Sequence, residues 1–452
     1  MDPLRSLFRL PDEPLFDRKR LLQMLWPLVI EQFLSVLVGM IDVLMVSSLG
    51  EEAMSGVSLV DSVNHLILQV LFALTAGGTV VCAKFIGARD DAGTAKGAAQ
   101  LLGITAAGML MLTVVFQAGG RQILGLIFGH VEPAVMESAV VYMRYTSCSF
   151  PFLAVYYSVS SVFRAQGNTR ISMLASLGMN LLNIVGNALC IYGLHMGIVG
   201  VALPTLLSRA AAACAMLVLL QRVENPLRLR SVKLFRPDGS ILWDILAIGI
   251  PNSVESSLFN LGKLLLQSLV ATLGTPSLAA YAVAGNLATY LYLPGNAIGA
   301  EITTVVGQCR GAGKPEQAKT YTVLLTLMNY LMLIPICLAL ILGRHFWVSC
   351  YHLSDQAAVL GAGLILAHSA AMILWPVAFN LPYHFRASGR ARFTMWVALA
   401  AMAFCRLGLA WLFVGLLHRN VLWVWYAMFV DWVFRIIVYG AAFRKPPKAA
   451  DG

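Results

Sequence analysis

Long apolar stretches recur along nearly the whole chain of 452 residues, and short polar connections separate them. A helix that spans a bilayer needs about 20 predominantly apolar residues. Stretches of that kind lie near 21–46, 54–82, 98–118, 137–163, 170–193, 196–220, 242–268, 277–306, 320–343, 356–385, 393–417 and 421–443. A membrane barrel would instead show segments of about 10 residues with alternating polarity. The pattern therefore predicts an all-α integral membrane protein with about twelve transmembrane helices.

The composition agrees with lipid as the main solvent of this surface. Hydrophobic residues make up 59% of the chain and charged residues only 12%, whereas a soluble domain carries about 25% charged residues. The first apolar run, from Leu21, is long enough to span and is followed by another, so we expect a helix rather than a cleaved signal peptide. The eight cysteines lie mostly within apolar stretches without a C-x-x-C pair, which predicts a packing role.

The formal net charge of +10 reflects how lysine and arginine are distributed among the loops. With a cytoplasmic N-terminus, the inner segments carry 24 of these residues and the outer segments four. Short loops rich in lysine and arginine stay in the cytoplasm. We therefore expect a multi-pass protein of the plasma membrane with both termini cytoplasmic. The positive charge needs no nucleic acid to explain it, and we expect none as a partner.

The two halves of the sequence resemble each other at a nearly constant offset. Pro27 and Glu31 find counterparts 224 residues later in Pro251 and Glu255, and the string FRAQG at 163–167 recurs as FRASG at 385–389. Such self-similarity is typical of an internal repeat. Six helices in each half bring both halves into the membrane from the same side, as in parallel-repeat transporters whose halves rock around a central cavity.

We therefore predict two pseudo-symmetric six-helix lobes. The expected organisation is a cytoplasmic N-terminal segment (1–20), an N-terminal lobe (21–220), a cytoplasmic linker (221–241), a C-terminal lobe (242–443) and a cytoplasmic tail (444–452).

The repeated strings resemble the multidrug and toxic compound extrusion (MATE) family over about residues 20–440. The first stretch carries Trp26 and Pro27, then GMID at 39–42 and LG at 49–50. The second half carries VVGQ at 305–308 and GAGKPEQA at 311–318, close to the family's loop after its eighth helix. In order and doubled, these strings identify a bacterial MATE-like efflux transporter.

The resemblance implies a secondary active exporter that expels organic cations, drugs or amphipathic metabolites in exchange for H⁺ or Na⁺. The expected cargo is a cationic or amphipathic small molecule, the expected partner is the lipid bilayer, and we expect a monomer. No cofactor or metal is expected beyond the coupling ion, and no Walker-type phosphate loop is found. The alternative is a flippase for lipid-linked saccharides of the same superfamily. An enzyme is not expected, because neither H-E-x-x-H nor G-x-S-x-G lies at membrane depth.

Four polar residues are predicted to share one depth in the outer half of the N-terminal lobe. Asp42, Asn187, Asn183 and Thr205 have similar distances from their helix ends at 1.5 Å per residue. Asn183 and Asn187 lie on one helix face, since positions i and i+4 align. The resemblance implies that these residues form the family's N-lobe cation site, with asparagine at 187 where some branches have aspartate. Hydrogen bonding between helices is the alternative.

Other ionisable residues within the predicted spans are further candidates, because charge at mid-membrane costs about 2.5–3.5 kcal/mol. Glu255 and Asp431 are predicted near the midplane of the C-terminal lobe, although Asp431 could instead pair with Arg435 one turn away. Glu31, the repeat partner of Glu255, is a cavity candidate.

Asp61 and Asn64 are also cavity candidates, with a solvated helix end as the alternative. Pro27 and Pro251 sit at equivalent places inside their helices, where proline removes a hydrogen bond and kinks the helix. We predict them as hinges, with static kinks as the alternative.

Overall fold

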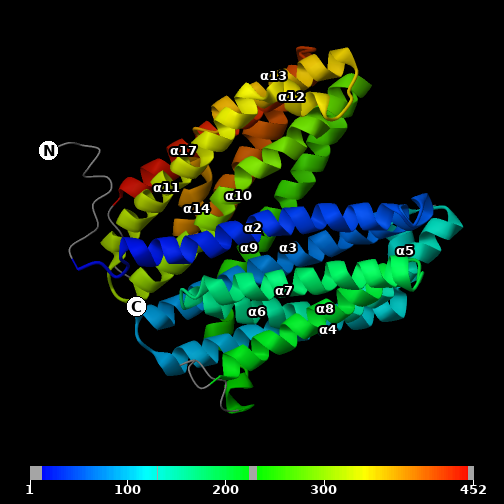
Figure 1. Ribbon diagram of the computed structural model, residues 1–452. Coiled ribbons are helices and arrows are strands. Elements are labelled where there is room, and N and C mark those ends of the chain that lie inside the picture. The colour runs from blue at the N-terminus through cyan, green and yellow to red at the C-terminus, as the bar shows by residue number, and fades with distance from the viewer. Residues whose placement is uncertain (1–12, 130, 223–231, 446–452) are drawn as a thin grey trace. The chain divides into compact units, whose positions relative to one another are not determined.

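The computed structural model describes residues 13–129, 131–222 and 232–445. Every regular element within these ranges is helical (Figure 1). Parts of the predicted N-terminal segment, linker and tail (1–12, 223–231 and 446–452) lie outside the described residues. The chain divides into two compact units, one of residues Leu22–Ile250 and one of Pro251–Gly452 with Met1–Leu21.

The first unit contains most of α2 and all helices up to the start of α9. Its elements are α2 (Arg18–Ser47), α3 (Glu51–Gly87), α4 (Asp91–Phe128), α5 (Pro133–Cys148), α6 (Phe150–Ala165), α7 (Thr169–Ala188), η1 (Leu189–Gly193), α8 (Val199–Gln221) and η2 (Val232–Phe235). Helix α6 lies at the centre of this unit, where it packs against α3, α4 and α8.

The second unit is built around α10. Its elements are α9 (Gly239–Ala271), α10 (Thr275–Gly311), α11 (Pro315–Leu342), α12 (Arg344–Ser349), α13 (Asp355–Ala371), α14 (Trp375–Ala387), α15 (Ala391–Ala400), η3 (Ala401–Gly408), α16 (Leu409–Trp411), η4 (Leu412–Leu416) and α17 (Leu422–Arg444). Helix α10 packs against α11, α13 and α14.

Within the described ranges, eight helices are long and apolar enough to cross a membrane, or nine if the bent pair α13–α14 forms one span. Three predicted spans are helical but do not pass this test. The span predicted at 137–163 is divided into α5 and α6 around Ser149, so each piece is short. The other two, at 242–268 and 277–306, are the long helices α9 and α10, which carry charged residues such as Lys263 and Glu301.

The backbone repeats at the offset that the sequence shows. Gly50 precedes α3 with a φ of 97°, and Gly274 precedes α10 with a φ of 91°. Glycine suits both turns because other residues rarely adopt positive φ. The π-helical turns η1 and η4 also follow α7 and the α15–α16 segment at equivalent places. Equivalent turns at equivalent positions indicate two copies of one helical unit.

The predicted hinge prolines lie inside unbroken helices. Pro27 is in the first third of α2, and Pro251 is in the first half of α9. Each lacks the N–H that would bond to the preceding turn. Their role as hinges stays a prediction.

The segment before α9 is fixed to α4 by polar contacts. The Gln100 side-chain amide donates to the carbonyls of Leu234 (2.9 Å) and Arg236 (2.8 Å). Lys96 forms an ion pair with Asp238, and this contact lowers the pKa of the Asp238 carboxyl. The ion pair therefore contributes at pH values above the ordinary pKa of aspartate and is lost as the pH falls through the lowered one.

Close packing of α10 against α14 depends on two glycines one turn apart. A Cβ atom at Gly295 would lie 1.9 Å from the Trp375 ring, and one at Gly299 would lie 2.2 Å from the Tyr383 ring. Trp375 is buried and stacks on Phe379 with ring centroids 5.0 Å apart. Small residues allow this close approach of helices in membranes, and the stacked indole has little room to move.

We predict that Gly295→Ala lowers the apparent melting temperature of the detergent-purified protein. Overpacking of this kind costs about 1–3 kcal/mol. Gly285→Ala on the same helix is the matched control, since no atom lies within 4 Å of its Cβ position. That change should leave the melting temperature unchanged or raise it, because alanine is the better helix former. Equal melting temperatures for the two variants would contradict this account of α10.

Candidate functional site

The predicted cluster around Asp42 is assembled from three helices of the first unit. Asp42 comes from α2, Asn183 and Asn187 come from successive turns of α7, and Thr205 comes from α8. Helices α7 and α8 pack against each other along their length. Asn187 is 1% exposed, and Asn183 and Thr205 are each 8% exposed. The structure thus brings all four side chains together.

Hydrogen bonds connect these side chains in one chain. The Asn187 amide donates to Asp42 Oδ1 (3.2 Å) and to Asn183 Oδ1 (3.3 Å). Asn183 in turn donates to the Thr205 hydroxyl (3.0 Å), which donates to the Val201 carbonyl (2.8 Å). The buried Asn187 Oδ1 has no hydrogen-bond partner in the part of the chain that the structure describes.

The residue types of this cluster suit a small cation. A carboxylate and neutral amide and hydroxyl oxygens are hard ligands of the kind that bind alkali and alkaline-earth cations. The unpartnered Asn187 Oδ1 could accept a hydrogen bond from a protonated Asp42 or coordinate a bound ion. The Asn187 amide nitrogen, and not its oxygen, faces Asp42, and a role of these residues in H⁺ or Na⁺ coupling stays a prediction.

Asp61 extends this cluster toward α3. It lies close enough to Asp42 to interact with it electrostatically, as does Arg209 of α8. The Tyr142 hydroxyl (3.3 Å) and the Asn64 amide (3.5 Å) donate to Asp61 Oδ1. Asn64 is buried while Asp61 is exposed. The two cavity candidates on α3 therefore belong to the same polar region as Asp42.

Glu31 and Glu255 form equivalent ion pairs in the two units. Arg164 donates to Glu31 Oε1 (2.6 Å), and Arg386 donates to Glu255 Oε1 (2.9 Å). The glutamates are repeat partners, and the arginines belong to the repeated string FRAQG/FRASG. The nearly equal offsets of the two repeats, 224 residues for the glutamates and 222 for the arginines, were the signal for this pairing, which the sequence-based predictions did not include. A cavity role for Glu31 and a coupling role for Glu255 stay predictions.

Asp431 is shared by two arginines. Arg435 Nε lies 2.7 Å from Asp431 Oδ1. This is the ion pair one turn apart that the sequence offered as the alternative to a coupling role. Arg406 Nη2 lies 3.0 Å from Asp431 Oδ2. Asp431 is 0% exposed, so its charge is compensated within the second unit. This arrangement fits an architectural ion cluster, and a coupling role stays a prediction.

Two ionisable residues were missed by the sequence analysis. Glu301 on α10 is 1% exposed, and neither of its carboxylate oxygens has a hydrogen-bond partner among the described residues. Arg406 lies in η3 and is 4% exposed. Both fall within predicted spans, so their charge was a visible signal. Within the second unit, arginines accompany the carboxylates Glu255 and Asp431.

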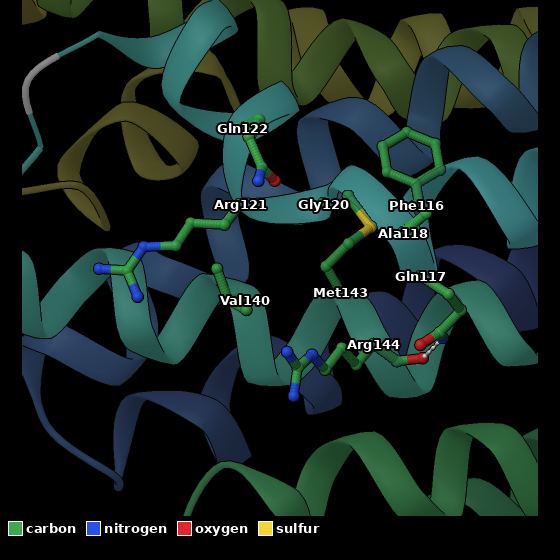
Figure 2. A pocket seen from close by; sticks show the side chains of 9 residues that line it. All are labelled: Phe116, Gln117, Ala118, Gly120, Arg121, Gln122, Val140, Met143 and Arg144. Carbon is green, nitrogen blue, oxygen red and sulfur yellow. Dashed lines mark hydrogen bonds between the residues drawn. The ribbon is translucent and has the colours of Figure 1, made fainter.

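A separate pocket of about 240 Å³ lies between α4 and α5 (Figure 2). Its lining includes Phe116, Met143 and the arginines Arg121 and Arg144. Two of its lining residues, Ala118 and Gly120, flank Gly119, where the backbone of α4 departs from helical dihedral angles. None of the residues predicted for the coupling site lines it, so this pocket is distinct from the Asp42 cluster.

The sequence is similar to a family model and to curated transporters. The sequence matches the family model MatE twice, over residues 27–189 and 251–412. It is 26% identical over 428 residues to the uncharacterized transporter YisQ of Bacillus subtilis, covering 93% of this chain and 92% of that protein. It is 30% identical over 322 residues to the probable multidrug resistance protein NorM of Thermotoga maritima, covering 69% and 68%.

Solved structures show the same fold. A MOP superfamily transporter from Pyrococcus furiosus, described by the reverse polarity of its binding pocket, superposes with a TM-score of 0.87 at 21% identity. The match covers 98% of this chain and 97% of that chain. The predicted all-α membrane fold is thereby confirmed.

We predict that the Glu255–Arg386 ion pair stabilises the second unit. Arg386→Gln should lower the apparent melting temperature, because a hydrogen bond to a charged group contributes about 1.5–3 kcal/mol and this pair is part-buried. The double variant Glu255→Gln/Arg386→Gln should recover part of the loss, since no carboxylate is then left without its arginine. A thermal-shift measurement of wild type, both single variants and the double variant gives the coupling energy. Simple additivity of the two single effects would contradict the pairing.

Proposed function

Because the chain belongs to the MATE family of transporters, we propose that it is a secondary active exporter that exchanges H⁺ or Na⁺ for small-molecule cargo. Proteins of this family are multi-pass membrane transporters and not enzymes. In this proposal both termini are cytoplasmic, as the distribution of lysine and arginine predicts.

The Asp42 cluster is the observation that supports cation coupling. Asp42 is half-buried, has no arginine or lysine within ion-pair distance among the described residues, and accepts a hydrogen bond from the Asn187 amide. By contrast, Glu31, Glu255 and Asp431 each have an arginine as counter-ion. Of these carboxylates, Asp42 is therefore the one best suited to gain and lose a cation during transport. Asn183, Asn187 and Thr205 would position that cation.

The energy from one coupling ion is sufficient for useful export. One charge that moves down 100 mV releases about 2.3 kcal/mol. Since about 1.4 kcal/mol corresponds to a tenfold concentration ratio, this energy sustains roughly a 50-fold gradient of an uncharged cargo. In an alternating-access cycle, a cation at Asp42 would favour one state of the lobes and cargo the other.

Drug-like cargo is supported by the relatives, whose names include a probable multidrug resistance protein. The relatives do not determine the sign of the cargo's charge, because one transporter of the same fold is described by the reverse polarity of its binding pocket. The sequence-based expectation of organic cations stays a prediction. A flippase for lipid-linked saccharides remains the alternative function. Such a flippase needs a cationic binding surface, and the addition of anionic lipid in the binding experiment described below tests for one.

We predict that Asp42→Asn lowers gradient-driven dye uptake into everted vesicles at least about tenfold, in the range of lost charged interactions at functional sites. A pH gradient and a Na⁺ gradient are imposed separately, with a rhodamine and fluorescein as the cationic and anionic dyes. Asp355→Asn, which removes an exposed carboxylate at the start of α13, is the matched control and should transport normally. Wild-type uptake by Asp42→Asn, with unchanged dependence on both gradients, would exclude Asp42 from coupling.

A further inference from the structure

Two cationic side chains of the second unit lie over the same aromatic ring. The Lys263 amine is 5.1 Å from the centroid of Phe259, one turn earlier on α9, and the Arg406 guanidinium is 5.3 Å from it. Attraction between a cation and a ring stabilises each contact. The two like charges also repel each other across a short distance, since Lys263 and Arg406 interact electrostatically.

Carboxylates do not compensate this positive charge. Among the described residues Lys263 has no acidic partner, and Arg406 shares Asp431 with Arg435. The nearby Glu255 is already paired with Arg386. Four cationic side chains thus share two carboxylates in this part of the second unit.

Arg406 also has unused hydrogen-bonding capacity. It is 4% exposed, and its Nε atom has no hydrogen-bond partner in the described ranges. A guanidinium presents its donors in a planar fork that suits carboxylate, sulfonate and phosphate groups. A buried donor left without an acceptor costs about 1–3 kcal/mol, which an anionic ligand would relieve.

Lys263 lies on the polar face of α9. At helical spacing this face continues through Asn252, Ser256, Asn260 and Gln267. The opposite face carries large apolar side chains that are exposed, namely Ile250, Val254, Leu258, Leu261 and Leu265. The apolar stripe is the one suited to lipid, so Lys263 is directed away from it.

Aromatic side chains provide an apolar environment beside these cations. Tyr281 and Tyr292 of α10 are half-buried, and both lie near Arg406. Tyr281 packs edge-on against Trp425 with ring centroids 6.3 Å apart. Rings of this kind suit the apolar part of an amphipathic molecule, and cations suit its charged group.

We propose that the second unit contains a binding site for an amphipathic organic anion, whose acidic group lies between Lys263 and Arg406. The inference names the cargo class of the transporter and so rests on the proposed function. It replaces the expected organic cation with a ligand that supplies the missing negative charge. In the absence of such a ligand, the excess cations repel one another and organic cations are disfavoured.

Binding of two dyes with a common xanthene ring system tests the proposal without transport. Fluorescein, an anion, and rhodamine 123, a cation, are titrated by fluorescence polarisation against full-length protein in phosphatidylcholine nanodiscs. Wild type should bind fluorescein more tightly than rhodamine 123. Lys263→Gln should weaken fluorescein binding about tenfold, as expected for the loss of a charged interaction, while Lys263→Arg should retain most of it.

Lys314→Gln is the matched control, because it removes the same charge at the start of α11. It should leave both affinities unchanged, and thermal shifts of all variants establish that they are folded. Tighter binding of rhodamine 123 than fluorescein by wild type, or equal fluorescein affinities for wild type and Lys263→Gln, would overturn the proposal.

Phosphatidylglycerol distinguishes a soluble anion from a lipid headgroup as the natural ligand. If the lipid competes, fluorescein affinity falls when phosphatidylglycerol is added to wild type, and falls much less in Lys263→Gln. If a soluble anion is the ligand, the lipid has little effect. Either result supports an anion site. Uptake into vesicles tests the proposed function separately, since binding of fluorescein without gradient-driven uptake would contradict export but preserve the anion site.

Discussion

The cost of placing charge inside a membrane is the constraint on which this structure depends. An ionisable side chain at mid-membrane costs about 2.5–3.5 kcal/mol, so each one must be compensated within its own unit. Most are compensated by arginine, as in the pairs Glu31–Arg164 and Glu255–Arg386. Three described residues are exceptions. Asp42 has no ion pair and accepts a hydrogen bond from the neutral Asn187 amide, Glu301 has no hydrogen-bond partner for its carboxylate, and Lys263 lies over an aromatic ring. We propose that Asp42 binds the coupling cation and that Lys263 binds the cargo, and each ligand would supply the charge that the protein lacks there.

The two units share the Glu–Arg ion pairs because they are copies of one helical unit, but they do not share the residues proposed for transport. The Glu–Arg pairs recur at equivalent positions of the two units, as do the glycine turns at Gly50 and Gly274. The features proposed for transport do not recur, because Gly39 stands where the repeat partner of Lys263 would be. The common framework thus stabilises both units, and the residues proposed to bind the coupling cation and the cargo lie where the two copies differ.

Apolar run length and repetition were sufficient to predict the helices and the fold from sequence, since both depend on local pattern. The Asp42 cluster was predictable in membership because depth and helical spacing bring Asn183 and Asn187 to one face. Its hydrogen-bond directions depend on side-chain rotamers and were not predictable. The environments of Arg406 and Glu301 depend on contacts between helices far apart in the sequence and were not predictable from local pattern.

Ion release on cargo binding tests the central claim most directly. Purified protein in weakly buffered detergent solution is titrated with fluorescein while a pH indicator and a Na⁺ electrode record the medium. The account predicts release of about one H⁺ or Na⁺ for each dye bound, as expected when two sites share one conformational equilibrium. The same titration of Asp42→Asn should show dye binding without ion release. Equal ion release from wild type and Asp42→Asn, or fluorescein binding to wild type without release of H⁺ or Na⁺, would contradict coupling at Asp42.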